Sequence, residues 1–445
     1  MIIRTPNSQL SDADPTSKRG LRHVGSWALG TRKTLGVLSL LFFVTFPIRA
    51  DAYSVLAHEA MVDALWDGSI APLLRVRYPR VNADDLAKAR AFAYGGSVIQ
   101  DLGYYPFGSR LFTNLVHYVR SGDFAEALLR EAHDVNEFAF ALGALAHYSS
   151  DNAGHPLAVN RAVPLIYPKL RAKYGPDVTY VEDPRRHVMV EFAFDVVQVA
   201  GGAYLPDAYR SFIGFEVAKP VLERAFTDTY ALELDDLFTN VDLAIGTYRY
   251  AVSRTIPEMT RVAWEDKQDE IRKAVPQVNR QAFIYALTRQ QYEQAFGTTY
   301  RKPGAFARFL GVLFKILPKI GPLAPLAFRA PTPEAERLFT DSFRTARDRY
   351  RTLLTDARDA RVQLPNTDFD TGRPATWGEY SLADETYLDL LEKLRGRSAT
   401  TLPAALRTDL VRFFETARSA APKDKNERKR LAKAREALDA IQNSK

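Results

Sequence analysis

Apolar residues recur at helical spacing through most of the chain between Tyr53 and about Arg254. In segments such as EFAFALGALAHY and VMVEFAFDVVQV, apolar side chains return every three or four positions. That period is typical of helices with a buried face, and the alternating pattern of strands is scarce. The helical pattern continues beyond residue 255. The sequence therefore predicts an all-α fold.

Breaks in this pattern divide the chain into predicted elements. Pro156 disfavours the helical conformation for His155, so we expect the helix that carries HYSSD to end near Asp151 or Asn152 and His155 to point elsewhere. The stretch YGPDVTYVEDP indicates a loop, after which a further helix begins near Arg185. The tail KDKNERKRLAKAREALDAIQ predicts a charged, solvated terminal helix.

The first 52 residues follow a different pattern. Arg32 and Lys33 precede the apolar run LGVLSLLFFVTF, and Pro47 and the small-residue triplet at 50–52 follow it. This order is typical of a secretory signal, and a run of about a dozen apolar residues is too short to span a bilayer comfortably. We expect cleavage after Ala52 and a secreted or periplasmic protein, with an uncleaved anchor as the alternative.

Composition limits the kinds of site that the chain can build. The full chain of 445 residues has a net charge of +7, and cleavage after Ala52 would leave 53 basic and 50 acidic residues, a net charge of +3. So small an excess gives little reason to expect nucleic-acid binding. The absence of cysteine excludes disulfides, thiolate zinc sites and a cysteine nucleophile. Metal ligands must therefore be histidines and carboxylates.

Five of the six histidines outside the leader lie near carboxylates in an order that suits metal binding. HYSSD and HVMVE each place a histidine and an acid on one helix face. A single such pair is more often a surface ion pair, but here apolar neighbours predict burial, which would cost several kcal/mol per ionisable group without a cation. Imidazole and carboxylate together suit zinc. The candidates are His58, Asp101, His117, His147, Asp151, His155, His187 and Glu191.

This order of residues resembles the zinc-dependent phospholipase C superfamily. That superfamily also contains the zinc single-strand nucleases and the catalytic domain of glycosylphosphatidylinositol-specific phospholipase D. The segment FALGALAHYSSDNAGHP is similar to the family's central helix, and the resemblance extends from about Tyr53 to Glu191. It implies a helical phospholipase C-like catalytic domain, which we place at 53–254. The signal-like pattern places a leader at 1–52, and the helical pattern without histidine beyond residue 255 predicts an accessory helical region at 255–445.

The resemblance also implies a ligand set of three zinc ions, two of which share one aspartate; the residues alone predict two to three ions. The family usually begins with Trp, whereas the predicted mature chain begins with Tyr53. The implied ligands are Asp101, His117, His147 and Asp151 for one ion of the pair, Asp151, His58 and the amino group and carbonyl of Tyr53 for the other, and His155, His187 and Glu191 for the third.

The activity implied is hydrolysis of a phosphodiester bond in a phospholipid. Zinc lowers the pKa of bound water to about 7, so a hydroxide would attack phosphorus at neutral pH. Asp101 and Asp151 are the expected catalytic residues, and Asp101 is a candidate general base as well as a ligand. Two alternatives stay open: a zinc single-strand nuclease, which the spacing from Tyr53 to His58 favours and the low charge and Glu191 disfavour, and a non-enzymatic zinc-stabilised surface-binding module.

Three weaker features each have two interpretations. One interpretation of the aromatic residues Tyr104, Tyr105 and Phe107 is that they line a headgroup pocket. The other is that they pack within a loop. The segment 303–331 carries apolar residues at helical spacing with basic residues opposite, which indicates either a membrane-surface contact or a helix packed on the accessory region. The stretch NTDFDTG, around residues 366–372, binds calcium or forms Asx turns, and the incomplete ligand run favours the turns.

Overall fold

The protein is described here from a computed structural model. The structure describes residues 55–200, 215–252, 267–270, 327–395, 402–417 and 425–443, together with Arg272 and Arg397. The predicted leader and Tyr53 lie outside the described residues, as does most of the segment 303–331. The described residues are almost entirely helical, which confirms the predicted all-α fold.

The elements before residue 253 are helices of different lengths, of which η1 and η3 are π-helical and η2 and η4 are 3-10 helical. They are α2 (Val55–Leu65), η1 (Trp66–Ile70), α3 (Ala71–Arg77), α4 (Ala83–Val98), η2 (Ile99–Tyr104), α5 (Arg110–Tyr118), α6 (Ser121–Arg130), α7 (Val135–Gly154), η3 (His155–Val159), α8 (Asn160–Ile166), α9 (Pro168–Tyr174), α10 (Pro184–Ala200), α12 (Lys219–Tyr230), η4 (Leu234–Asp236) and α13 (Val241–Tyr250).

The later elements include the only two strands in the described ranges, which pair antiparallel over two residues each. They are α18 (Pro333–Arg358), β1 (Thr367–Asp368), β2 (Arg373–Pro374), α19 (Ser381–Leu394), α20 (Ala404–Ala417) and α21 (Lys425–Asn443).

Helix α7 is the buried centre of the fold. Its side chains are buried from Glu137 to Gly154, so it presents apolar residues to neighbours on all sides. Its first turn is closed by Asp134, whose carboxylate accepts hydrogen bonds from the backbone N–H groups of Asn136 and Glu137. Helices α4 and α18 pack against α7.

Glycines allow α4 and α7 to approach each other closely. A β-carbon on Gly96 would lie 1.8 Å from the carbonyl oxygen of Phe140, and one on Gly143 would lie 2.0 Å from that of Ala93. The two backbones are therefore in direct contact. This contact brings the carbonyl oxygen of Ser97 to 2.9 Å from Nδ1 of His147, which connects the packing of the helices to the candidate site.

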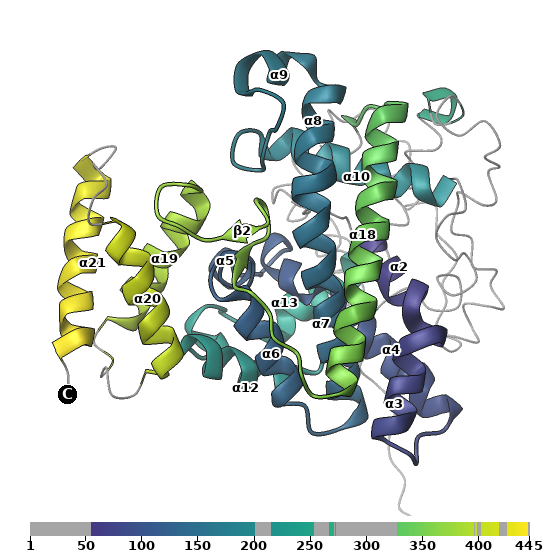
Figure 1. The fold of residues 1–445 in the computed structure, drawn as a ribbon, viewed down its shortest axis with the longest axis horizontal. Coiled ribbons are helices and arrows are strands. Elements are labelled where there is room, and N and C mark those ends of the chain that lie inside the picture. Colours follow the sequence, from purple (N-terminus) through teal and green to yellow (C-terminus); the bar gives the residue numbers. More distant parts are fainter. Residues whose placement is uncertain are drawn as a thin grey trace, which may run out of the picture. The chain divides into compact units, whose positions relative to one another are not determined.

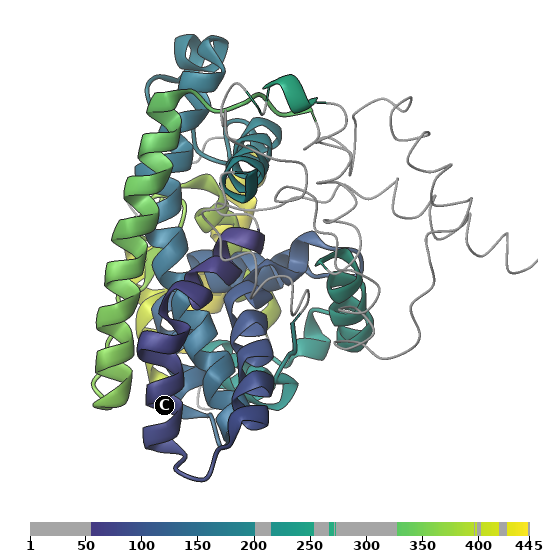
Figure 2. The same cartoon turned by 90° about the vertical axis from the view of Figure 1, so that its right-hand side faces the viewer.

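Helix α18 comes from the C-terminal region but packs along α7, as Figures 1 and 2 show. Thr332 caps its first turn by accepting a hydrogen bond from the N–H of Ala335. Its buried residues recur every three or four positions, and the hydroxyl of Tyr350 donates to the carbonyl oxygen of Leu142 at 2.9 Å. One face of α18 thus covers the central helix.

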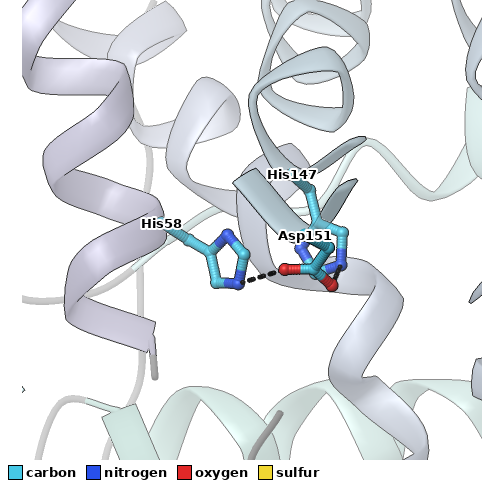
Figure 3. A group of neighbouring side chains, drawn as sticks. All are labelled: His58, His147 and Asp151. Carbon is cyan, nitrogen blue, oxygen red and sulfur yellow. Dashed lines mark ion pairs between the residues drawn. The ribbon is translucent and has the colours of Figure 1, made fainter. Parts of the chain in front are cut away.

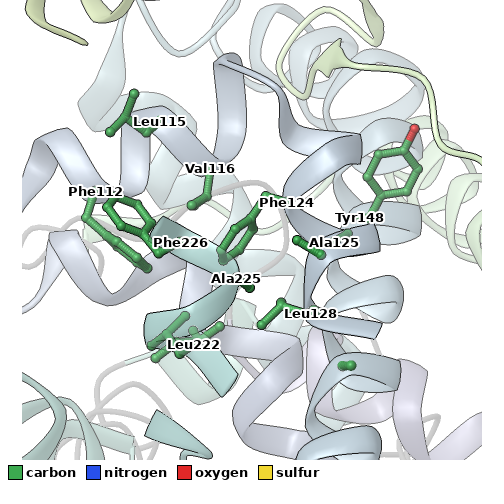
Figure 4. Close-up of a cluster of buried hydrophobic side chains, with 14 of the residues drawn as sticks. Phe112, Leu115, Val116, Phe124, Ala125, Leu128, Tyr148, Leu222, Ala225 and Phe226 are labelled. Carbon is green, nitrogen blue, oxygen red and sulfur yellow. The ribbon is translucent and has the colours of Figure 1, made fainter. Parts of the chain in front are cut away.

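The hydrophobic core draws on both regions of the chain. Figure 4 shows the part where α5, α6 and α12 meet, with the rings of Phe112 and Phe226 5.4 Å apart. The same core cluster includes buried residues of α18, α19, α20 and α21. The predicted boundary at residue 254 stays a prediction. The predicted terminal helix is present as α21, but Leu431 and Leu438 on one face are buried rather than solvated.

Within the described residues, no helix combines the length and the apolar character needed to cross a bilayer. The apolar run of the leader and the apolar positions predicted at 306–317 lie outside those residues.

We predict that Gly143→Ala destabilises the protein by at least about 1–3 kcal/mol, because the new methyl group would meet a backbone oxygen that cannot move without separating α4 from α7. Thermal unfolding followed by circular dichroism measures this loss. Gly246→Ala in α13 is the matched control, since nothing lies within 4 Å of its β-carbon position. That change should be neutral or should stabilise by up to about 1 kcal/mol. An equal response of the two variants would contradict the close contact.

Candidate metal centre

Asp151 lies at the centre of a buried cluster of histidines. Its Oδ2 is 3.0 Å from Nε2 of His147 and 3.4 Å from Nε2 of His117, and its Oδ1 is 3.4 Å from Nε2 of His58. Figure 3 shows His58 reaching this carboxylate from α2, opposite His147. All four side chains are fully buried. One carboxylate therefore faces histidines from three different helices, with a separate oxygen toward His58.

Nε2 of His117 has three neighbouring ligand atoms at the separation expected between two ligands of one zinc. Nε2 of His117 lies 3.5 Å from Oδ1 of Asp101, 3.4 Å from Oδ2 of Asp151 and 3.3 Å from Nε2 of His147. Zinc bonds of 2.0–2.2 Å in a tetrahedron separate neighbouring ligand atoms by about 3.3–3.5 Å. His117 is thus spaced from Asp101, Asp151 and His147 as one zinc ligand is from another.

The hydrogen bonds of two histidines direct their inner ring nitrogens to one position. Nδ1 of His117 lies 2.8 Å from the carbonyl oxygen of Thr113, and Nδ1 of His147 lies 2.9 Å from that of Ser97. A carbonyl oxygen only accepts, so both Nδ1 atoms carry a hydrogen and both rings direct Nε2 inward. The two Nε2 atoms face each other at 3.3 Å and are positioned to bind the same cation.

The local fold holds Asp101 at this cluster. Asp101 lies in η2, directly after α4, and the hydroxyl of Thr113 ties η2 to α5. That hydroxyl donates to the carbonyl oxygen of Gln100 at 2.6 Å and accepts from the N–H of Gly103 at 2.8 Å. Because α5 also carries His117, the two elements place Asp101 and His117 on the same side of Asp151.

Burial keeps three of the histidines neutral, and neighbouring histidines keep the central aspartate ionised. Burial and the neighbouring His147 lower the pKa of His58 from 6.5 to about 4, and burial likewise lowers the pKa of His155 to about 4 and that of His187 to about 3. Burial alone would raise the pKa of Asp151, but His147 and His58 hold it well below its usual value. Neutral imidazoles and an ionised carboxylate are the forms that bind a metal.

The third predicted group, His155, His187 and Glu191, is also brought together. One ligand atom from each lies within 4.8 Å of the others. Nδ1 of His187 is 2.7 Å from Oε1 of Glu191, and its Nε2 is 2.9 Å from Oδ1 of Asn160. Both nitrogens of His187 are engaged, so a metal there would replace one of these hydrogen bonds. His155 forms no hydrogen bond through either ring nitrogen.

The predicted end of the central helix is wrong. Helix α7 continues past Asp151 to Gly154 and passes directly into the π-helix η3, with His155 in the right-handed helical conformation. The wider turn of a π-helix takes up Pro156, which has no N–H to donate. His155 therefore stays on the face of Asp151, and its Nε2 lies 3.9 Å from Oδ2 of that residue.

The sequence analysis considered the loop of Asp370 only for calcium and did not place Asp370 in the metal centre; this residue lies 179 positions beyond Glu191, the last of the predicted ligands. Its Oδ1 lies 3.3 Å from Nε2 of His155. The predicted Asx turn is present, because Oδ1 of Asp368 accepts hydrogen bonds from the N–H groups of Asp370 and Thr371. The local sequence predicts this turn but contains no signal for the direction of the Asp370 side chain.

The predicted aromatic group does not behave as one unit. Tyr105 is buried and stacks on Tyr248 with ring centroids 3.9 Å apart, which confirms the packing interpretation for that residue. Tyr104 is also buried, and its ring lies 6.5 Å from that of His117. Phe107 is 43% exposed. Of the three, Tyr104 borders the metal centre.

Comparison with known protein families matches residues 57–240 to the family described as zinc dependent phospholipase C. This segment contains all eight candidate ligands from His58 to Glu191. Residues 57–240 are therefore a domain of the zinc-dependent phospholipase C superfamily, as the sequence motifs indicated. Searches of curated proteins and of solved structures gave no match.

We predict that the metal-free protein loses stability as the pH falls from 6.5 to 4. The folded-state pKa values of His58 and His155 lie below the ordinary 6.5, so the unfolded chain binds protons in this window that the folded chain does not. Stability is therefore complete above pH 6.5 and falls by up to about 3 kcal/mol per histidine on acidification.

Thermal unfolding of EDTA-treated protein between pH 7.5 and 4.5 tests this dependence. The variant His155→Gln should lose less stability over the same range, and His133→Gln, at an exposed histidine outside the cluster, is the control. A midpoint independent of pH in this window would contradict the burial of neutral histidines.

Proposed function

We propose that this protein is a secreted or periplasmic zinc phosphodiesterase that cleaves phospholipids in the manner of phospholipase C. The observation that carries the proposal is the carboxylate of Asp151, which faces three buried histidines with atom spacings that suit zinc. Membership of residues 57–240 in the zinc-dependent phospholipase C superfamily supports the class of reaction and the phospholipid substrate.

The described side chains fit two neighbouring zinc ions that share Asp151. Asp101, His117, His147 and Oδ2 of Asp151 would hold one ion, and Oδ1 of Asp151 and His58 would hold the other. Helix α2 begins at Val55, and His58 lies in its first turn, close along the chain to the predicted new terminus at Tyr53. We propose that the amino group and carbonyl of Tyr53 complete the second set.

Bound zinc supplies a Lewis acid for the phosphodiester and a water nucleophile that is available at neutral pH. The residues of the chain orient this chemistry. The carbonyl oxygens of Ser97 and Thr113 fix the rings of His147 and His117, so that Nε2 faces the reacting region. Asp101, only 3% exposed, directs a carboxylate to the same point, where it would accept the proton of the attacking water. Burial of these groups strengthens their electrostatic effect on the substrate.

Substrate assays separate this proposal from the two alternatives. The zinc-loaded protein beginning at Tyr53 is incubated with phosphatidylcholine, phosphatidylethanolamine and single-stranded DNA. Release of a phosphorylated headgroup supports the proposal, and cleavage of DNA alone would instead identify a nuclease. Zinc binding without turnover of any of the three would identify a zinc-stabilised surface-binding module.

We predict that Asp151→Asn lowers the zinc content by about two ions and the hydrolysis rate by more than about 100-fold, because this carboxylate would contact both metals of the pair. Elemental analysis and a phosphodiesterase assay measure the two effects. Asp384→Asn is the control, since Asp384 is a buried carboxylate outside the predicted ligand set that accepts hydrogen bonds from the backbone N–H of Gly378. Wild-type zinc content in the Asp151 variant would show that the shared ligand is elsewhere.

We also predict that activity requires a free amino group at Tyr53. A free α-amino group has a pKa near 8, so zinc displaces its proton easily at neutral pH, whereas an amide nitrogen is a poor ligand. A protein made with Met-Ala before Tyr53 should lose most activity and about one zinc ion relative to one that begins at Tyr53. Equal zinc content and activity in the two forms would rule out the terminus as a ligand.

A further inference from the structure

A loop from the C-terminal region is anchored directly on the metal centre. This loop, residues 364–372, connects α18 to α19 and contains β1. Its main-chain oxygens accept hydrogen bonds from Tyr148 and Ser121, at 2.8 Å on Pro365 and 2.6 Å on Thr367. The N–H of Phe369 donates to the carbonyl oxygen of His117 at 3.2 Å, next to a candidate ligand. The loop is thus attached to α5, α6 and α7 at several points.

Phe369 covers the histidines that face Asp151. Its ring centroid lies 5.2 Å from that of His117 and 6.0 Å from that of His147. The adjacent residue, Asp370, is only 1% exposed. Loop 364–372 lies beyond residues 57–240, which match the family, and it therefore covers one side of the metal centre through Phe369.

Asp370 is held in a fixed orientation toward His155. Its Oδ2 accepts hydrogen bonds from the hydroxyls of Tyr118, at 3.2 Å, and Tyr380. Its main-chain oxygen accepts a bond of 2.7 Å from the side chain of Asn160, whose own oxygen contacts His187. These contacts leave Oδ1 to face His155.

The separation between Asp370 and His155 is that of two metal ligands. Oδ1 of Asp370 lies 3.3 Å from Nε2 of His155. A charge-assisted hydrogen bond between the two would be about 2.7–2.9 Å long, whereas two ligands of one zinc lie about 3.3–3.5 Å apart. His155 is fully buried and forms no hydrogen bond through either ring nitrogen. Its Nε2 is therefore directed at a position that a cation would satisfy.

We propose that Asp370 is a ligand of the cation bound at His155, so that the C-terminal region contributes directly to the metal centre. This inference rests on the zinc binding in the proposed function. Asp370 would add a ligand beside His155 to the predicted set of His155, His187 and Glu191, which have one ligand atom each within 4.8 Å of the others. The third ion would then fasten loop 364–372 to the centre.

Replacement of Asp370 in the full-length mature protein by serine and by cysteine tests the assignment. Either change removes the hydrogen bonds from the two tyrosines, but only cysteine offers a zinc ligand, and the chain has no other cysteine. We expect Asp370→Ser to lose about one zinc ion per chain by elemental analysis and Asp370→Cys to retain it. Affinity for the weakest zinc, measured by chelator competition, should fall at least about 10-fold in the serine variant.

Two controls separate a lost ligand from a disturbed fold. Asp409→Asn alters a buried carboxylate that belongs to none of the ligand groups and accepts a 2.8 Å hydrogen bond from Tyr387, and this variant should keep all zinc. His155→Gln should lose the same ion as Asp370→Ser, and the double variant should lose no more than either alone. Circular dichroism checks that each variant is folded.

Wild-type zinc content and affinity in Asp370→Ser would overturn the assignment. Unchanged zinc with a faster hydrolysis rate would also overturn it, and would show that Asp370 occupies the place of a substrate phosphate. Failure of the proposed function is recognised separately, because the unmodified protein would then bind no zinc, or would bind zinc without hydrolysing a phospholipid.

Discussion

The structure depends on one electrostatic constraint: ligand atoms of like character meet in the interior without a counter-charge from the protein. Two imidazole lone pairs and the carboxylates of Asp101 and Asp151 converge where water is excluded. Such an arrangement is unfavourable by several kcal/mol unless a cation lies among them. The hydrogen bonds of the outer nitrogens fix this arrangement, since they prevent the rings from turning their donors inward. The close approach of α4 and α7 brings the carbonyl oxygen of Ser97 within hydrogen-bonding distance of Nδ1 of His147.

Much of the fold and most of the candidate site could be predicted because both depend on the spacing of apolar and ligand-type residues along single helices. The four-residue steps of HYSSD and HVMVE put His147 with Asp151 and His187 with Glu191 on the same helix faces, and the apolar residues between them indicate burial. The end of the central helix was predicted wrongly for a related reason. Local preference places a break before Pro156, but tertiary packing and a π-helical turn carry the helix through His155.

The contribution of the C-terminal region could not be predicted from sequence. The stretch NTDFDTG shows an Asx turn at Asp368, and that turn is present. The direction of the next carboxylate, Asp370, is set by hydroxyls of Tyr118 and Tyr380, and the first of these lies 252 positions away. A contact of this kind leaves no periodic trace in a single chain. Helix α18 shows the same limit, because its amphipathic pattern predicts a buried face but does not name α7 as its partner.

Loop 364–372 also has a consequence for the order in which the chain folds. Hydrogen bonds such as that from Ser121 to Thr367 join residues 246 positions apart, so they close a very long segment of chain. Closing such a segment is entropically costly and is typical of slow, late steps in folding. Helices α2 to α10 can associate earlier through contacts between near neighbours, while the surface of α7 that Phe369 and α18 later cover stays open to solvent. We therefore expect the position beside His155 and Asp370 to form late in folding, when the last quarter of the chain docks.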